Sequence, residues 1–239
     1  MKTSTIATIL AFIAPMSVSA SIIDFENLEA GEASFPVTSV SSADDTFTFS
    51  LALLNAGDSP GAAIFNSDEP GFDPDLVPTR GPGTGVSGNV LILQEDIPTA
   101  SGIPDDNAGS GTIVLTLTSG SDFQFTGASA VDDATFGFAY ALAGDAISAF
   151  GDASFLGEIE NPAGSAAGDN FADDLVFASP SAVLGIGDSI LINYSGSGAV
   201  DSLLLAPVVP EVPVPASALL LGGGIAAFAA VKRRRKPKA

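Results

Sequence analysis

Apolar and polar residues alternate with a period of two along several short stretches of this chain. The alternation is clearest in residues 46–51 and 112–118, where Phe, Leu, Ile and Val alternate with Thr and Ser. A period of two divides the side chains between the two faces of a strand, so each stretch predicts a strand with one buried face. The same reading predicts strands at residues 22–27, 46–54, 62–65, 89–94, 112–118, 122–126, 135–142, 153–159, 175–178, 182–184, 189–194 and 200–205.

The segments between these strands consist largely of Gly, Pro, Asp and Asn, as in residues 55–61. These residues favour turns, and no segment between the strands has the apolar period of an amphipathic helix. About a dozen short strands of this kind favour an all-β fold, a two-sheet β-sandwich or jelly roll. We therefore predict one β-sandwich ectodomain over residues 21–205, followed by a stiff, Pro-rich stalk over residues 206–215.

The N-terminus has the pattern of a secretory signal peptide. Lys2 precedes an apolar run from Ile6 to Ala14, and the small residues Val18-Ser19-Ala20 follow. This order predicts a signal peptide over residues 1–20, with cleavage between Ala20 and Ser21. The alternative, an uncleaved N-terminal anchor, would require a longer apolar region.

The C-terminus has the pattern of a membrane helix followed by a basic stop. Residues 216–231 carry no charge, and as a helix they would extend about 24 Å, short of a ~30 Å hydrocarbon core. Snorkelling basic side chains and local bilayer thinning can supply the difference. We predict a single transmembrane helix over 216–231 and, by the positive-inside rule, a cytoplasmic tail over 232–239. The basic stop consists of Lys232, Arg233, Arg234, Arg235 and Lys236.

A short Pro-containing signature precedes that helix, Val212-Pro213-Val214-Pro215-Ala216. The signature, the apolar helix and the basic cluster, in this order, resemble the PEP-CTERM class of bacterial sorting tails in its VPLPA variant. Val214 stands where that variant usually has Leu. The resemblance implies that an exosortase, a membrane-embedded cysteine transpeptidase, cuts near the signature and delivers the upstream part to the cell surface or extracellular matrix of an exopolysaccharide-producing bacterium. The alternative is an ordinary single-pass anchor.

Charge is distributed very unevenly. All 28 Asp and Glu residues lie between Asp24 and Glu211, where Arg80 is the only basic residue, so this segment carries a net charge of −27. Such a field repels nucleic acid and attracts cations, which excludes a nucleic-acid-binding function. One interpretation of the carboxylates is a solubilising surface suited to salty water. Because the chain has no Cys, disulfides cannot stabilise the exported domain, and bound divalent cations would be one substitute.

Eight carboxylates fall within residues 68–106, all in or beside predicted loops. Carboxylate, amide and backbone oxygens are the ligands that Ca²⁺ prefers, and it needs six to eight of them. The spacing matches neither an EF-hand nor the Gly-rich nonapeptide repeat, so the signal is one of composition. The alternative is that these acids cap turns and accept backbone N–H bonds. The residues predicted to reach one end of the sandwich and bind Ca²⁺ are Asp73, Asp75, Glu95, Asp96, Asp105 and Asp106.

Five short segments of the exported part also resemble PEP-CTERM ectodomains. They are Asp73-Pro74-Asp75-Leu76, Gly88-Asn89-Val90-Leu91-Ile92, Glu95-Asp96, Pro104-Asp105-Asp106-Asn107 and Ser197-Gly198-Ala199-Val200-Asp201. The resemblance implies no particular activity, because that family is defined mainly by its tail.

The absence of His and Cys excludes a Ser-His-Asp triad, a Cys nucleophile and the usual His-containing zinc sites. We predict that the chain is not an enzyme but an exported structural or adhesive protein, associated with exopolysaccharide and dependent on Ca²⁺. Two alternatives stay open. One is a carbohydrate-active hydrolase with a carboxylate pair, for which Glu158 and Glu160 on one strand face are candidates. The other is a passively anchored envelope protein without a ligand.

Overall fold

The computed structural model describes residues 20–31, 35–68, 76, 88–95, 109–131, 135–160 and 172–208. The chain separates into two units, residues 1–208 and 209–239, and all described residues belong to the first. The predicted signal peptide up to Ser19, the sorting signature, the helix over 216–231 and the basic stop lie outside the described residues. Within the described ranges, no helix is long and apolar enough to cross a membrane.

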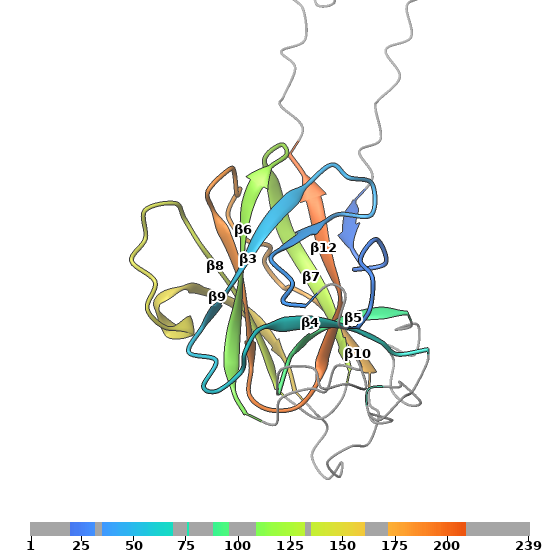
Figure 1. The fold of residues 1–239 in the computed structure, drawn as a ribbon. Helices are drawn as coiled ribbons and strands as arrows, with labels where there is room; N and C mark the ends of the chain where they lie inside the picture. The colour runs from blue at the N-terminus through green and yellow to red at the C-terminus, as the bar shows by residue number, and fades with distance from the viewer. Residues whose placement is uncertain are drawn as a thin grey trace, which may run out of the picture. The chain divides into compact units, whose positions relative to one another are not determined.

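The described residues form two antiparallel sheets (Figure 1). The first sheet has the strand order β10-β7-β12-β5-β4, with β1 also paired to β12. Its strands are β1 (Ser21–Ile23), β4 (Ala62–Asn66), β5 (Asn89–Leu93), β7 (Phe123–Val131), β10 (Ala172–Val176) and β12 (Ala199–Pro207). The second sheet has the order β2-β3-β6-β11-β8-β9. Its strands are β2 (Ser39–Ser41), β3 (Thr48–Leu54), β6 (Gly111–Ser119), β8 (Phe136–Ala141), β9 (Ser154–Ile159) and β11 (Ser189–Tyr194).

The alternation of apolar and polar residues decides which face of each strand is buried. In β6, the side chains of Ile113, Leu115 and Leu117 are buried in the core. Phe47 and Phe49, in the alternating stretch of residues 46–51, are also fully buried. Their burial removes one apolar face of each strand from water, at roughly 25 cal/mol per Å² of apolar surface. The prediction of one buried face per strand is confirmed for both stretches.

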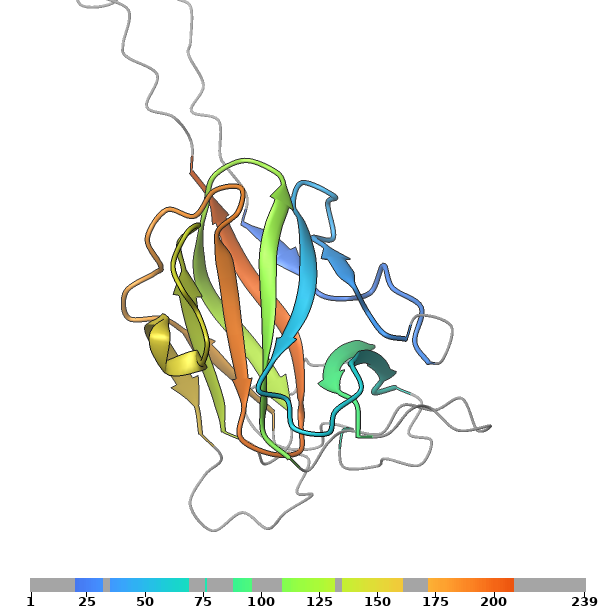
Figure 2. The same ribbon diagram turned by 60° about the vertical axis from the view of Figure 1, so that its left-hand side comes forward.

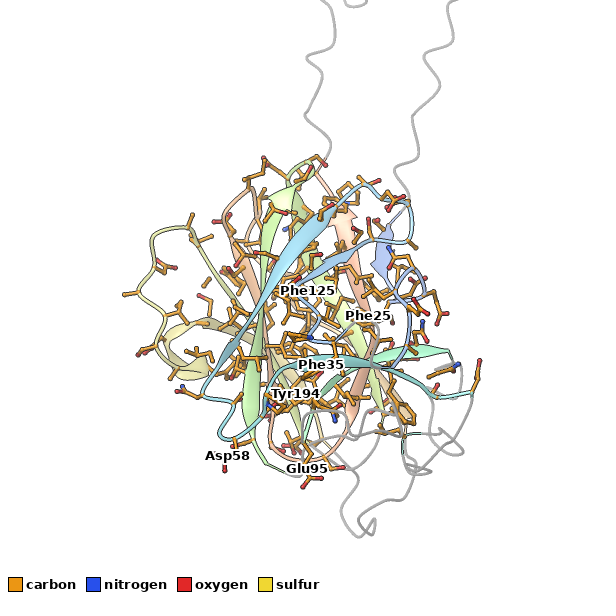
Figure 3. The ribbon with its side chains drawn as sticks, in the orientation of Figure 1. Phe25, Phe35, Asp58, Glu95, Phe125 and Tyr194 are labelled. Carbon is orange, nitrogen blue, oxygen red and sulfur yellow. The ribbon has the colours of Figure 1, made fainter. Side chains whose placement is uncertain are left out.

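One Phe-rich core lies between the two sheets and contains buried residues from both. Phe125 of β7 packs edge-on against Phe177, with ring centroids 4.8 Å apart, and also contacts Phe138 of β8 in the opposite sheet. A hydrogen bond joins the sheets as well, because the buried Tyr194 hydroxyl donates to the Leu91 carbonyl at 2.8 Å. Figure 3 shows Phe125 and Tyr194 in this interior. The prediction of a two-sheet β-sandwich is confirmed.

The two sheets also meet along their sides. On one side, the Ala43 amide donates to the Ile22 carbonyl at 2.8 Å, linking β1 to the turn after β2. On the other side, Leu175 and Phe177 lie against Gly157 of β9. Figure 2 shows both sheets from a second direction, with β4 and β5 set to one side of the longer strands. The start of β1 and the end of β12 are neighbours, because Ser21 pairs with Leu205.

Most predicted strands are found within a few residues of their expected positions. The prediction for residues 22–27 was too long, since β1 ends at Ile23 and Phe25 has a positive φ of 59°. The prediction of a strand at residues 182–184 was wrong, because these residues form only one isolated β-bridge, between Leu184 and Phe123. The short strand β2 was not predicted. Its sequence, Ser-Val-Ser, holds a single apolar residue, and only pairing with β3 buries it.

Candidate functional site

Of the six residues predicted to bind Ca²⁺, the structure describes only Glu95. The other five, Asp73, Asp75, Asp96, Asp105 and Asp106, lie outside the described residues, so their part of the prediction stays a prediction. Among the described residues, no three acidic side chains are grouped closely enough to hold a metal ion. The described chain therefore contains one acidic side chain of the expected site and no complete metal-binding group.

Glu95 lines a polar cleft of about 500 Å³. The described residues around it come from the turn after β3, the end of β5 and the approach to β6: Asn55, Ala56, Gly57, Asp58, Glu95, Gly109 and Ser110. Two residues of the turn have left-handed backbone, Asn55 at φ 51° and Gly57 at φ 58°, which Asn and Gly accept most readily. The turn was predicted from its Gly, Pro, Asp and Asn content, but the role of Asp58 in a cleft was not.

Hydrogen bonds to the loop backbone hold the cleft walls. The Asn55 side-chain amide donates to the Ser148 carbonyl at 2.9 Å, and the Ser59 hydroxyl donates to the Gln94 carbonyl at 2.7 Å. Gly111 is packed against Ala56 so closely that a Cβ there would lie 2.8 Å from the Ala56 Cα. These contacts fix the two loops relative to each other, so the positions of Asp58 and Glu95 are set by the backbone.

Within the described part of the chain, neither Asp58 nor Glu95 has a hydrogen bond or an ion pair. Figure 3 shows both carboxylates at the same end of the sandwich, opposite the end at which β12 finishes. Two carboxylates supply only part of the six to eight oxygens that Ca²⁺ requires. They are suited to attract a hydrated cation, and further oxygen ligands would be needed for a closed site.

Several described acids outside residues 68–106 act as turn caps. Asp44 accepts hydrogen bonds from the hydroxyls of Ser21 and Ser42, both at 2.7 Å, and from the Thr46 amide. The Ser42 hydrogen bond is the largest cause of a pKa for Asp44 well below its usual range. Asp188 accepts the amides of Ala143 at 2.6 Å and Gly185 at 2.7 Å. These carboxylates organise the turns and are not free to bind a ligand.

Glu158 and Glu160, the candidate pair for glycoside hydrolysis, do lie together. Their hydrogen bond, with some help from desolvation and charge repulsion, raises the pKa of Glu158. A hydrogen-bonded pair is closer than the ~5–9.5 Å that separates the carboxyls of glycosidases. The pair belongs to the edge of the second sheet, and neither glutamate is among the residues around the cleft. The arrangement does not favour sugar hydrolysis at this position.

A second, smaller groove of about 330 Å³ lies on the outer face of the second sheet. It is bordered by β3, β6 and β11 and by the loop after β8, with Leu53, Val114, Leu142 and Leu191 among its described lining residues. Within the described chain, no Phe, Tyr or Trp lines either this groove or the Glu95 cleft. Sugar rings stack on aromatic faces, so these two surfaces lack that means of binding.

The structure brings together two of the segments that resemble PEP-CTERM ectodomains. Residues 88–92 form most of β5 and residues 199–201 begin β12, and the strands pair through Ala199 with Ile92 and Val200 with Leu91. β1 pairs with the same strand through Ile23 and Leu203, which places Asp201 near the segment after β1. Asp201 is half-buried, and burial, followed by the charges of Glu26, Asp174 and Asp24, raises its pKa to about 7. No sequence pattern singled out this carboxylate group, because its members are distant in the chain.

Comparisons with known proteins add little. No protein-family model and no curated protein matches the chain. One solved structure, the K2 cleaved adhesin domain of Lys-gingipain, aligns with 79% of this chain and 96% of its own, at 15% identity and a TM-score of 0.29. A likeness at this level assigns neither a family nor an activity, so the function has to be argued from the residues themselves.

Proposed function

We propose that this chain is an exported, acidic β-sandwich that an exosortase sorts to the cell surface or extracellular matrix. There it acts as a structural or adhesive module that associates with exopolysaccharide through divalent cations. The observation that carries this proposal is the unbalanced charge of the sandwich. All eight Lys and Arg residues of the chain lie outside the described residues, so no described carboxylate is neutralised by a described basic side chain.

Unbalanced carboxylates make cations the natural partners of this surface. An acidic polysaccharide would be repelled by a body with a net charge of −27, unless cations lay between the two. Ca²⁺ readily takes carboxylate oxygens from more than one source and tolerates irregular geometry. The cleft of Asp58 and Glu95 supports this view, because both of its acidic side chains are without described partners.

The sorting part of the proposal rests on the tail. The signature ending at Ala216, the uncharged run and the basic stop support a membrane helix over 216–231 that is held temporarily and then processed. Ala20 is exposed and Ser21 is the first residue of β1, so a cut between them would leave every described strand intact. The Asp58–Glu95 cleft lies at the end of the sandwich opposite the end at which β12 finishes.

We propose no enzymatic activity. The chain lacks His and Cys, and the candidate carboxylate pair Glu158 and Glu160 is hydrogen-bonded at a sheet edge. If the following experiment shows that Ca²⁺ does not bind, it would support a passively anchored protein without a ligand.

The test is a calcium titration of the full-length chain, purified in detergent, by calorimetry with thermal melting in parallel. We expect micromolar binding and a melting temperature that rises with free Ca²⁺, because a ligand that binds only the folded state stabilises it. The double variant Asp58→Asn with Glu95→Gln should weaken binding about tenfold, and matched NaCl should not reproduce the heat. No heat and no shift with Ca²⁺ would contradict the cation-dependent function and leave the sorting proposal standing separately.

A further inference from the structure

Asp201 occupies an irregular position in the first sheet. Its neighbours in β12 pair with β7, Val200 with Ala130 and Ser202 with Ser129, so Asp201 is the extra residue of a β-bulge. A bulge redirects a side chain and often marks a functional position. The Ser202 hydroxyl donates to the Ser129 hydroxyl at 3.0 Å, which holds the strand on the far side of the bulge.

Three other carboxylates, from two elements, lie close enough to Asp201 to disfavour its ionised form. β1 pairs with β12 up to Ile23 and Leu203, so the segment after β1 continues alongside Asp201. Glu26 and Asp24 come from the segment directly after β1, and Asp174 comes from β10. Asp174 pairs with Ser129, the residue that also pairs with Ser202, so it lies one strand away from the bulge. The described residues that pair on either side of Asp201, Ser129 and Ala130 of β7 and Leu91 of β5, carry no titratable group. Thus the charged neighbours of Asp201 in the described chain are all acidic.

Glu26 has little freedom to move away. Its carboxylate accepts a hydrogen bond from the backbone N–H of Asn89 at 2.7 Å. The side-chain amide of Asn89 donates to the Leu28 carbonyl, also at 2.7 Å. Gly88 has a positive φ of 83°, and a Cβ at this residue would overlap the Glu26 carboxylate. These contacts dock residues 24–28 against the start of β5. Any repulsion between Asp201 and Glu26 therefore acts directly on this docked segment.

We propose that Asp201 is a proton-operated latch, which is protonated while residues 24–28 are docked on the first sheet and loosens that docking when it ionises. Burial and the acidic neighbours support this, since they raise the pKa of Asp201 to about 7 from an ordinary 3.8. Because the value is higher in the docked state, docking is favoured by protonation. Its stability should fall as pH rises from about 4 to about 7, and change little above that.

The test is hydrogen exchange of the backbone N–H of Asn89, which reports directly on the hydrogen bond between this group and Glu26. The full-length chain is measured between pH 5 and pH 8.5 with a chelator present, and the rates are corrected for intrinsic exchange. In the wild type we expect protection of this amide to fall at least about tenfold over that range, since one pKa unit corresponds to a factor of ten. In Asp201→Asn the corrected protection should be independent of pH.

Two further variants keep the result interpretable. Asp122→Asn removes an exposed carboxylate just before β7, at the opposite end of that strand from Ser129 and Ala130, and should behave as the wild type does. Glu26→Gln keeps an oxygen that can accept the Asn89 amide while removing the strongest neighbouring charge, and should move the transition to lower pH. A flat wild-type profile, or a profile unchanged in both Asp201→Asn and Glu26→Gln, would overturn the proposal. Should Asp201→Asn fail to fold, the shift in Glu26→Gln decides alone.

Discussion

Replacement of Tyr194 by Phe tests the hydrogen bond that joins the two sheets. Tyr194 is fully buried in β11, and its hydroxyl donates to the Leu91 carbonyl of β5 at 2.8 Å. The bond is structurally important because β5 pairs with β12 through only Ala199 and Val200. The Phe ring would keep the edge-on contact with Phe136, at 5.1 Å between centroids, and only the hydroxyl would be lost.

The expected effect follows from the desolvation of the groups involved. Without the hydroxyl, the buried Leu91 carbonyl loses one partner, which lowers the free energy of unfolding by about 1–2 kcal/mol. For a domain of this size, that corresponds to a fall in melting temperature of roughly 2–8 °C. Tyr194→Ala would remove the ring as well and should cost roughly 3–5 kcal/mol, through the cavity it leaves.

The assay is urea unfolding followed by far-ultraviolet circular dichroism, because the chain has no Trp and only two Tyr residues for fluorescence. The chain offers a matched control in its other tyrosine. Tyr140 of β8 is only partly buried and its hydroxyl has no hydrogen bond within the described residues, so Tyr140→Phe should change the unfolding free energy by less than about 0.5 kcal/mol. Equal effects of the two substitutions would refute the argument that the inter-sheet bond contributes to stability.

Three other predictions follow from the charges and the tail. Asp44→Asn should lower the unfolding free energy by about 1 kcal/mol at neutral pH. The pKa of Asp44 is lowered in the folded state, so its contribution is present above about pH 4 and lost as pH falls below it, and the variant's acid unfolding curve should be correspondingly flatter. Raising NaCl from low concentration to 1 M should raise the wild-type melting temperature by roughly 5 °C, since salt screens the repulsion among carboxylates, and a decrease would contradict that explanation. In an exosortase-bearing host, Pro213→Ala with Pro215→Ala should leave a full-length, membrane-retained form on immunoblots, and normal release of this variant would reject the sorting signal.

Parts of the candidate site were within reach of sequence reasoning and parts were not. Glu95 was predicted because it lies in an acid-rich run beside a strand, and it does line a cleft. Asp58 was read only as a turn residue, since its proximity to Glu95 depends on how two loops distant in sequence meet. The turn-capping role that was considered for the acids of residues 68–106 is found at Asp44 and Asp188 instead, because short acidic side chains bond to nearby backbone amides whatever the rest of the fold does.

The sequence by itself determined the class of structure. Alternating Phe, Leu and Ile positions dictate which side of each strand leaves water, so the strands of the sandwich and their buried faces follow from local order. The tertiary structure alone decided the pairing of β1 and β5 along one edge of β12, the short strand β2 and the bulge at Asp201. The reason is physical: strand pairing joins residues such as Ser21 and Leu205 that no local pattern connects. An electrostatic environment like that of Asp201 is the sum of charges brought together only by that pairing.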